Sequence, residues 1–131
     1  AVKNVLNAVQ SESGKLIGVL GCGGDRDKSK RPLMGQELAK HCDIAIFTSD
    51  NPRSEDPETI LDEMCSNLVL DDKRIRITDR REAIATAATF ANSGDCIIVL
   101  GKGHEVGQEI SGEINPFDDR VELAKAIEEL A

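Results

Sequence analysis

Aromatic residues are scarce in this sequence, which has three Phe, no Trp and no Tyr among its 131 residues. Such a chain offers no surface on which the bases of single-stranded nucleic acid could stack. The net charge is −8, which argues against a nucleic-acid partner and against an anionic membrane surface. No apolar run approaches the length of a membrane span, and no secretory signal is present. We therefore expect a cytoplasmic protein that is not inserted in a membrane.

Cysteine motifs for metal binding or redox chemistry are also missing. Cys22, Cys42, Cys65 and Cys96 lie at least twenty residues apart, and no C-x-x-C pair occurs. This spacing argues against a zinc site and a dithiol motif. We expect reduced thiols packed in the interior. The chain opens on Ala1 without an initiator Met, which suggests a piece of a longer protein.

Short apolar segments alternate with segments of helical periodicity along the whole chain. This alternation predicts a single α/β domain over residues 1–131, doubly wound and Rossmann-like, with a mainly parallel sheet. A small antiparallel hairpin is expected over residues 108–114, near the C-terminus. Strands are expected at residues 16–20, 43–47, 74–78 and 96–100, and helices in the first dozen residues and at 32–41, 57–64, 80–92 and from 118 or 119 to 130. The alternating pattern of residues 74–78 predicts a strand near an edge of the sheet. Asp79 is expected to cap the helix at 80–92, and Asp118 or Asp119 the last helix.

Polar loops of unusual composition follow three of the expected strands. They contain residues 21–31, 48–57 and 101–105. The carboxyl ends of parallel strands meet at one edge of a sheet, and ligand sites in open α/β folds gather at that edge. We therefore expect the three loops to converge there.

The second loop contains Asp50-Asn51-Pro52-Arg53. Asn51 offers hydrogen-bond donors and acceptors, Pro52 stiffens the backbone, and Arg53 presents a planar fork that matches a carboxylate or a phosphate. The alternative is that Asp50 and Asn51 only form a turn and that Arg53 is solvated. Asp56 is expected to cap the helix that follows.

The first loop, residues 21–31, is rich in glycine and precedes a helix, an arrangement typical of anion binding. It matches neither the dinucleotide-binding fingerprint nor the P-loop, so it predicts no nucleotide site. Without further support, Arg26 and residues 28–31 would be a solvated basic loop. Asp25 and Asp27 could bind a metal ion, but loop carboxylates more often bind water, and we assign no metal site.

The motifs together resemble a known family. The matching segments read GCGGDRDKSKRPLMG, TSDNPRSEDP, GKGHE and NPFDDR, and the resemblance covers the chain from about Leu16 onward. It is to the C-terminal domain of the Mur ligases of peptidoglycan synthesis, and within that family to the members that accept meso-diaminopimelate, which DNPR marks. Ser29 departs from the family, which usually has Gly there, and we interpret it as a tolerated loop change.

The resemblance implies a binding site for meso-diaminopimelate. The implied contact residues are Arg26, Asp50, Asn51, Pro52, Arg53, Gly101 and Glu105. It also implies that the full-length enzyme uses ATP and Mg²⁺, bound mainly outside this chain, and that its other domains bind UDP-MurNAc-L-Ala-D-Glu. No catalytic residue is expected in this stretch, and the chain alone is expected to be inactive.

The chemistry of the implied residues agrees with that substrate. Arg26 and Arg53 can each bind a carboxylate through charge-assisted hydrogen bonds, and Glu105 can hold the ammonium at the end that does not react. Lysine lacks the second carboxylate and would leave Arg53 unpaired, at a cost of roughly 1–3 kcal/mol or more. The pocket is therefore expected to select meso-diaminopimelate.

Two other functions remain open from the residues alone. A receiver-like regulatory domain would use Asp50 and Lys102 at its strand ends, but it needs an acidic pair after the first strand, where this chain has Gly21-Cys22-Gly23-Gly24. An amino-acid-binding module without ligase activity is the second alternative. We assign no catalytic role to Lys102 or His104.

Overall fold

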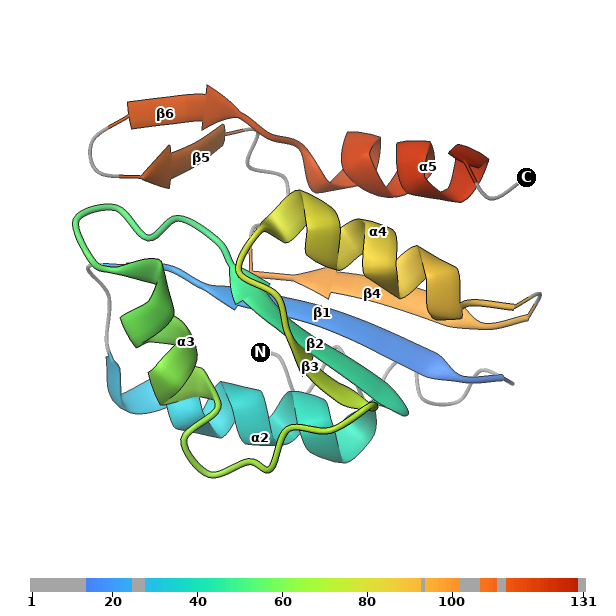
Figure 1. Cartoon of the computed structure of the whole chain (residues 1–131), viewed down its shortest axis with the longest axis horizontal. Helices are drawn as coiled ribbons and strands as arrows, with labels where there is room; N and C mark the ends of the chain where they lie inside the picture. Colours follow the sequence, from blue (N-terminus) through green and yellow to red (C-terminus); the bar gives the residue numbers. More distant parts are fainter. Residues whose placement is uncertain (1–13, 25–27, 93, 102–106, 111–112, 130–131) are drawn as a thin grey trace.

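A computed structural model describes residues 14–24, 28–92, 94–101, 107–110 and 113–129. The helix expected in the first dozen residues lies outside these ranges. Four parallel strands form the centre of the described part, in the order β3-β2-β1-β4 (Figure 1). The strands are β1 (Leu16–Cys22), β2 (Ile44–Ser49), β3 (Arg74–Arg76) and β4 (Cys96–Leu100).

Helices cover both faces of this sheet, as expected for a doubly wound domain. They are α2 (Arg31–His41), preceded by the short 3₁₀ helix η1 (Lys28–Lys30), α3 (Pro57–Met64), α4 (Arg80–Phe90) and α5 (Asp119–Glu129). In Figure 1, α2 and α3 lie below the sheet, whereas α4 lies above it with α5 beside α4.

Side chains that alternate along β1 divide the core between the two faces. Leu16 and Leu20 pack in the cluster that contains α2 and α3, and Ile17 and Val19 pack in the cluster that contains α4. All seven residues of β1 are buried, because helices cover both faces of a central parallel strand. The sequence prediction of the fold class is confirmed.

The helices begin at the capping residues that the sequence predicts. Asp56 accepts a hydrogen bond from the backbone N–H of Glu58 at 2.9 Å, and Asp79 accepts one from Glu82 at 3.2 Å. At α5 the cap is Asp118, which accepts from the backbone N–H of Arg120 at 2.9 Å. Asp119, the other candidate, has a different partner, described below.

Four boundaries of the parallel strands differ from the expectation. β1 ends at Cys22 rather than at Leu20, and β2 begins at Ile44 rather than at Asp43. β2 continues through Thr48 and Ser49, which were assigned to the following loop, because Gly21 and Cys22 of β1 extend in parallel and pair with them. β3 ends at Arg76 rather than at Thr78. β3 lies at an edge of the described sheet, as its alternating pattern predicts.

The antiparallel hairpin near the C-terminus is also confirmed. It consists of β5 (Gly107–Ile110) and β6 (Glu113–Pro116), with Glu109 paired to Ile114. The hairpin lies beside the loop that follows β2, at the carboxyl end of the parallel strands (Figure 1). This position allows it to contribute to the candidate site.

Candidate functional site at the carboxyl edge of the sheet

The described parts of the three predicted loops lie together at the carboxyl edge of the sheet. The backbone N–H of Gly24, after β1, donates to the carbonyl of Asn51, after β2, at 2.6 Å. Gly101, after β4, approaches β1 so closely that an added Cβ would lie 2.1 Å from the carbonyl oxygen of Gly21. The topology therefore brings these segments together as predicted. Of the seven predicted contact residues, Arg26 and Glu105 lie outside the described residues.

The loop Asp50–Arg53 is anchored by β5. The side chain of Asn51 accepts the backbone N–H of Glu109 at 2.8 Å, and the carbonyl of Asp50 accepts the side-chain amide of Gln108 at 2.9 Å. Asp50, Asn51 and Pro52 are buried. The alternative that Asp50 and Asn51 only form a turn is therefore wrong, because both are hydrogen-bonded to the hairpin.

Arg53 adopts a left-handed backbone conformation, with φ of 54°. This conformation is uncommon for a residue other than glycine, so surrounding contacts must hold it. The backbone N–H of Arg53 donates to the carbonyl of Glu109 at 2.9 Å, and its Nη1 donates to the carbonyls of Gly24 at 3.0 Å and Asn51 at 3.3 Å. These bonds fix the guanidinium over the edge of the sheet.

The guanidinium of Arg53 keeps part of its binding capacity. Its side chain is 21% exposed, so the alternative of a solvated Arg53 holds only in part: most of the side chain is covered, and the rest reaches solvent. Nε lies 3.9 Å from a carboxylate oxygen of Glu109, and no described residue bonds Nη2. A ligand carboxylate could accept a hydrogen bond from that nitrogen.

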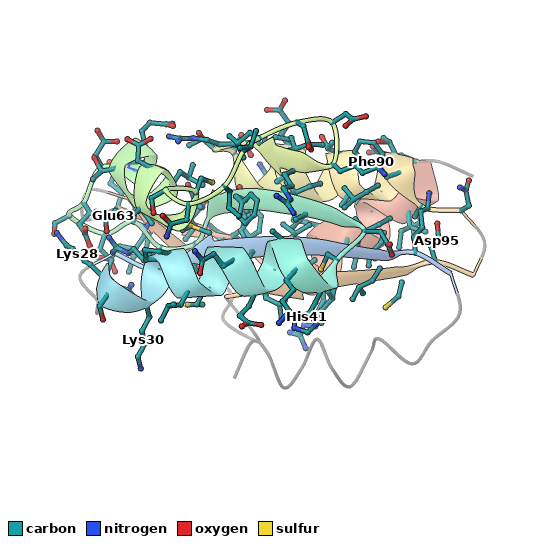
Figure 2. The ribbon with its side chains drawn as sticks, turned by 90° about the horizontal axis from the view of Figure 1, so that it is seen from below. Lys28, Lys30, His41, Glu63, Phe90 and Asp95 are labelled. Carbon is teal, nitrogen blue, oxygen red and sulfur yellow. The ribbon has the colours of Figure 1, made fainter. Side chains whose placement is uncertain are left out.

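Arg31 belongs to a buried network and not to a solvated basic loop. Its Nη2 donates to Glu55 at 2.8 Å and to the carbonyl of Gly23 at 3.0 Å, and its Nη1 donates to Glu63 at 3.0 Å. The hydrogen bond to Glu55 raises the pKa of Arg31, so the guanidinium keeps its charge. Lys28 also pairs with Glu55, and Figure 2 shows Lys28 and Glu63 at the same end of the molecule. This network joins the first loop to the second.

Sequence reasoning missed Arg80, a second buried arginine at this edge. Its Nε and Nη2 bind both carboxylate oxygens of Asp119, at 2.8 and 2.7 Å. A signal was present in the sequence, because Arg80 precedes Ala83, Ile84 and Ala87 at helical spacing and therefore lies on the buried face of α4.

An open cavity of about 440 Å³ lies beside the predicted loop but is not formed by it. Its lining comes from the start of α4, the ends of β2 and β6, and Gln108 of β5; it includes Ser49, Thr78, Arg80, Gln108 and Phe117. Of residues 48–57, only Ser49 and Pro57 contribute, and none of Asp50–Arg53 does. The candidate site and this cavity are therefore neighbours at the same edge.

Among the described residues, no group of three His, Cys, Asp or Glu side chains could hold a metal ion. All four cysteines are free thiols, as expected. Burial raises the pKa of Cys22 and of Cys42 to about 12, so these thiols stay neutral. Within the described ranges, no helix combines the length and apolar character needed to cross a membrane.

Comparison with known proteins identifies the domain. Residues 1–103 match the family model described as "Mur ligase, glutamate ligase domain". The chain belongs to this family. Membership supports the Mur ligase interpretation and not the receiver-like alternative, and it assigns the described carboxyl edge to a ligase domain.

Bacterial relatives are identical to this Mur ligase domain at about half of the aligned positions. UDP-N-acetylmuramoyl-L-alanyl-D-glutamate–2,6-diaminopimelate ligase of Bacteroides thetaiotaomicron is 50% identical over 97% of this chain. The enzyme of the same name from Streptomyces coelicolor is 49% identical over 97% of the chain. The chain spans 27% and 26% of the length of these two relatives.

A solved structure has the same fold. It is titled as a structure of UDP-N-acetylmuramoyl-L-alanyl-D-glutamate–2,6-diaminopimelate ligase and matches with a TM-score of 0.91 at 44% identity. The match covers 98% of this chain and 27% of that chain. The whole domain therefore corresponds to about a quarter of a larger ligase.

Proposed function

We propose that this chain is the amino-acid-binding domain of an ATP-dependent ligase that joins meso-diaminopimelate to UDP-MurNAc-L-Ala-D-Glu. Family membership supports ligase function, and the names of the similar enzymes support 2,6-diaminopimelate as the amino acid. The single observation that carries the assignment is the placement of Arg53, which is held over the carboxyl edge of the sheet with Nη2 left for a ligand.

The role of the site is to hold one substrate in a fixed place. Arg53 binds a carboxylate of meso-diaminopimelate, while Asp50, Asn51 and Pro52 maintain the loop that carries Arg53. Gly101 lies at the end of β4 on the same edge. From the family pattern, we propose that Arg26 and Glu105 complete the set.

The proposed reaction is formation of an amide. ATP, when bound to the complete enzyme, converts the γ-carboxylate of the D-glutamate into an acyl phosphate. The amine held by this domain then attacks the acyl carbon, the carbon–oxygen bond to phosphate breaks, and the amine loses a proton. Holding the amine close to the acyl group makes the encounter effectively intramolecular, which is the main rate contribution expected from this domain. Excluding water also protects the acyl phosphate.

The described residues do not fit a resident site for Mg²⁺ and ATP. They contain no group of three metal-ligating side chains, and the glycine-rich loop after β1 is not a P-loop. We propose that ATP and Mg²⁺ bind mainly to parts of the enzyme outside this chain. The free thiols agree with a reducing cytoplasm as the location.

The decisive experiment is a titration of the labelled chain with meso-diaminopimelate and with lysine, followed by NMR of the amides near the three loops. The wild-type chain should bind meso-diaminopimelate more tightly. Arg53→Ala should abolish this preference, roughly a ten- to hundredfold change in the ratio of affinities, because one charge-assisted hydrogen bond is lost.

The matched control is Arg74→Ala. Arg74 is the first residue of β3 and therefore lies at the opposite, amino edge of the sheet. Its removal should leave the preference unchanged. An equal response of the wild-type chain to both amino acids would contradict the proposed specificity.

A further inference from the structure

The guanidinium of Arg80 connects the ends of two strands that carry predicted site residues. Its Nη1 donates to the carbonyl of Ser49 at 2.9 Å, and its Nη2 donates to the carbonyl of Leu100 at 3.2 Å. Ser49 is the last residue of β2 and directly precedes Asp50; Leu100 is the last residue of β4 and directly precedes Gly101. The side chain of Arg80 is therefore bonded to the last strand residue before each of these two site segments.

The strand β1 lies between β2 and β4, so the guanidinium must cross it. The crossing occurs at Gly21, where an added Cβ would lie 2.5 Å from Nη1 of Arg80. A side chain at position 21 would therefore displace the guanidinium. Gly21 in β1 leaves room for Arg80 of α4, and the contacts of Arg80 therefore span three neighbouring strands.

The ion pair between Arg80 and Asp119 is buried and does not lie on the surface. The side chain of Arg80 is fully buried, and that of Asp119 is 7% exposed. Desolvation of a buried ion pair offsets much of its Coulomb attraction, so an ion pair contributes less to stability than well-packed apolar residues can. The ion pair differs from apolar packing in its geometry, because the planar guanidinium of arginine binds several partners in fixed directions.

We propose that Arg80 is a positioning residue that sets the separation of Asp50–Arg53 from Gly101, and that Asp119 holds its fork in the required orientation. The inference rests on the proposed function, because that function makes both segments part of one amino-acid site. Arg80 does not touch the substrate. It acts through Ser49 and Leu100.

The substitution Arg80→Lys removes the planar guanidinium but keeps the positive charge. The lysine ammonium can still neutralise Asp119, but as a point charge it cannot hold two carbonyls and a carboxylate in a plane. We expect affinity for meso-diaminopimelate to fall about tenfold or more, because the carboxylate partner moves out of hydrogen-bond geometry. We also expect faster hydrogen exchange at the amides of Arg53 and Glu109, which join the loop to the hairpin.

The control for lost stability is Asp95→Asn. Asp95 accepts the backbone N–H groups of Lys15 at 2.9 Å and Asn92 at 2.8 Å, at the opposite end of the molecule from Glu63 and Lys28 (Figure 2). This variant should weaken the fold without changing either the affinity of the folded protein or the exchange at Arg53 and Glu109. A merely structural Arg80 would make Arg80→Lys behave in the same way.

Each outcome of this comparison has a defined meaning. If Arg80→Lys matches Asp95→Asn in both affinity and local exchange, the positioning role is overturned. If the wild-type chain does not distinguish meso-diaminopimelate from lysine, the proposed function fails, while faster exchange in Arg80→Lys would still support positioning. Should Arg80→Lys not fold, Asp119→Asn takes its place, and exchange at Arg53 and Glu109 no faster than in Asp95→Asn overturns the proposal.

Discussion

Arg31, Arg53 and Arg80 lie near the carboxyl edge of the sheet, and their different surroundings give them different roles. Arg31 and Arg80 are 2% and 1% exposed and bind carboxylates within the chain. Arg53 keeps an exposed part and a nitrogen that no described residue bonds. The sequence motif predicted Arg53 as a binding residue, but the partners of Arg31 and Arg80 come from distant segments that no local pattern specifies.

Gly101→Ala tests the close approach of β4 to β1. Gly101 has φ of +110°, and its added Cβ would lie 2.1 Å from the carbonyl oxygen of Gly21. We expect a loss of about 2 kcal/mol or more in the free energy of unfolding, from backbone strain plus the clash. Urea denaturation measures this loss.

Gly94→Ala is the control for the strain term alone. Gly94 has φ of +92°, but nothing lies within 4 Å of an added Cβ. Its substitution should cost about 1–2 kcal/mol. Equal losses for the two variants would contradict the importance of the approach to Gly21.

The reactivity of Cys22 and Cys42 provides a second test at the residue scale. Burial raises the pKa of both thiols to about 12, so at pH 8 they are protonated and poor nucleophiles. We expect both to react slowly with a disulfide reagent in the folded chain and rapidly in denaturant. Rapid labelling of either thiol in the native protein would contradict the burial that raises its pKa.

At the scale of secondary structure, the helix starts and the bounds of β4 were predictable, whereas the carboxyl ends of β1, β2 and β3 were not. Asp56 and Asp79 act through neighbours two and three residues away, so the local sequence contains the whole interaction. Thr48 and Ser49 are polar and resemble loop residues, but pairing with Gly21 and Cys22 extends β2 through them. Long-range pairing, which a single segment does not encode, decides such boundaries.

Glu58 links the first turn of α3 to β3 and gives a test of acid stability. It accepts hydrogen bonds from the hydroxyl of Thr78 at 2.6 Å and from Arg76 at 2.9 Å, and these bonds lower its pKa below the ordinary value of 4.5. The folded-state pKa is thus below the unfolded one. The contribution of Glu58 is present above pH 4.5 and is lost as the pH falls through the folded-state value.

Glu58→Gln should therefore reduce the loss of stability that the wild type shows as the pH falls below 4.5. Urea denaturation of the wild type and the variant across this range measures the effect. Glu128→Gln, a change at an exposed residue of α5, serves as the control. Identical pH profiles for wild type and Glu58→Gln would show that the interaction does not stabilise the fold.

At the scale of the whole molecule, parallel topology predicted that the loops after β1, β2 and β4 share one edge, and the described parts of those loops do so. It did not predict that the hairpin would dock on Asp50–Arg53. That contact joins side chains of Asn51 and Gln108 to the backbone across 58 residues of sequence. Contacts at such separation depend on the complete fold.

Ligase activity should require more than this chain. The similar enzymes are about four times as long, since the chain spans 27% of the Bacteroides thetaiotaomicron enzyme, and the loop after β1 is not a P-loop. We expect no ATP-dependent coupling of meso-diaminopimelate to UDP-MurNAc-L-Ala-D-Glu by the 131-residue chain, as assayed by phosphate release and mass spectrometry. Product above background would contradict this expectation.

The docked hairpin provides a place for a reporter group. Ile114 is 72% exposed and pairs with Glu109, whose backbone bonds both Asn51 and Arg53. A fluorophore attached at position 114 would therefore sit one strand away from the loop that carries Arg53, without occupying that loop. Its emission could be used to follow occupancy in real time and to screen small molecules in the carboxyl edge.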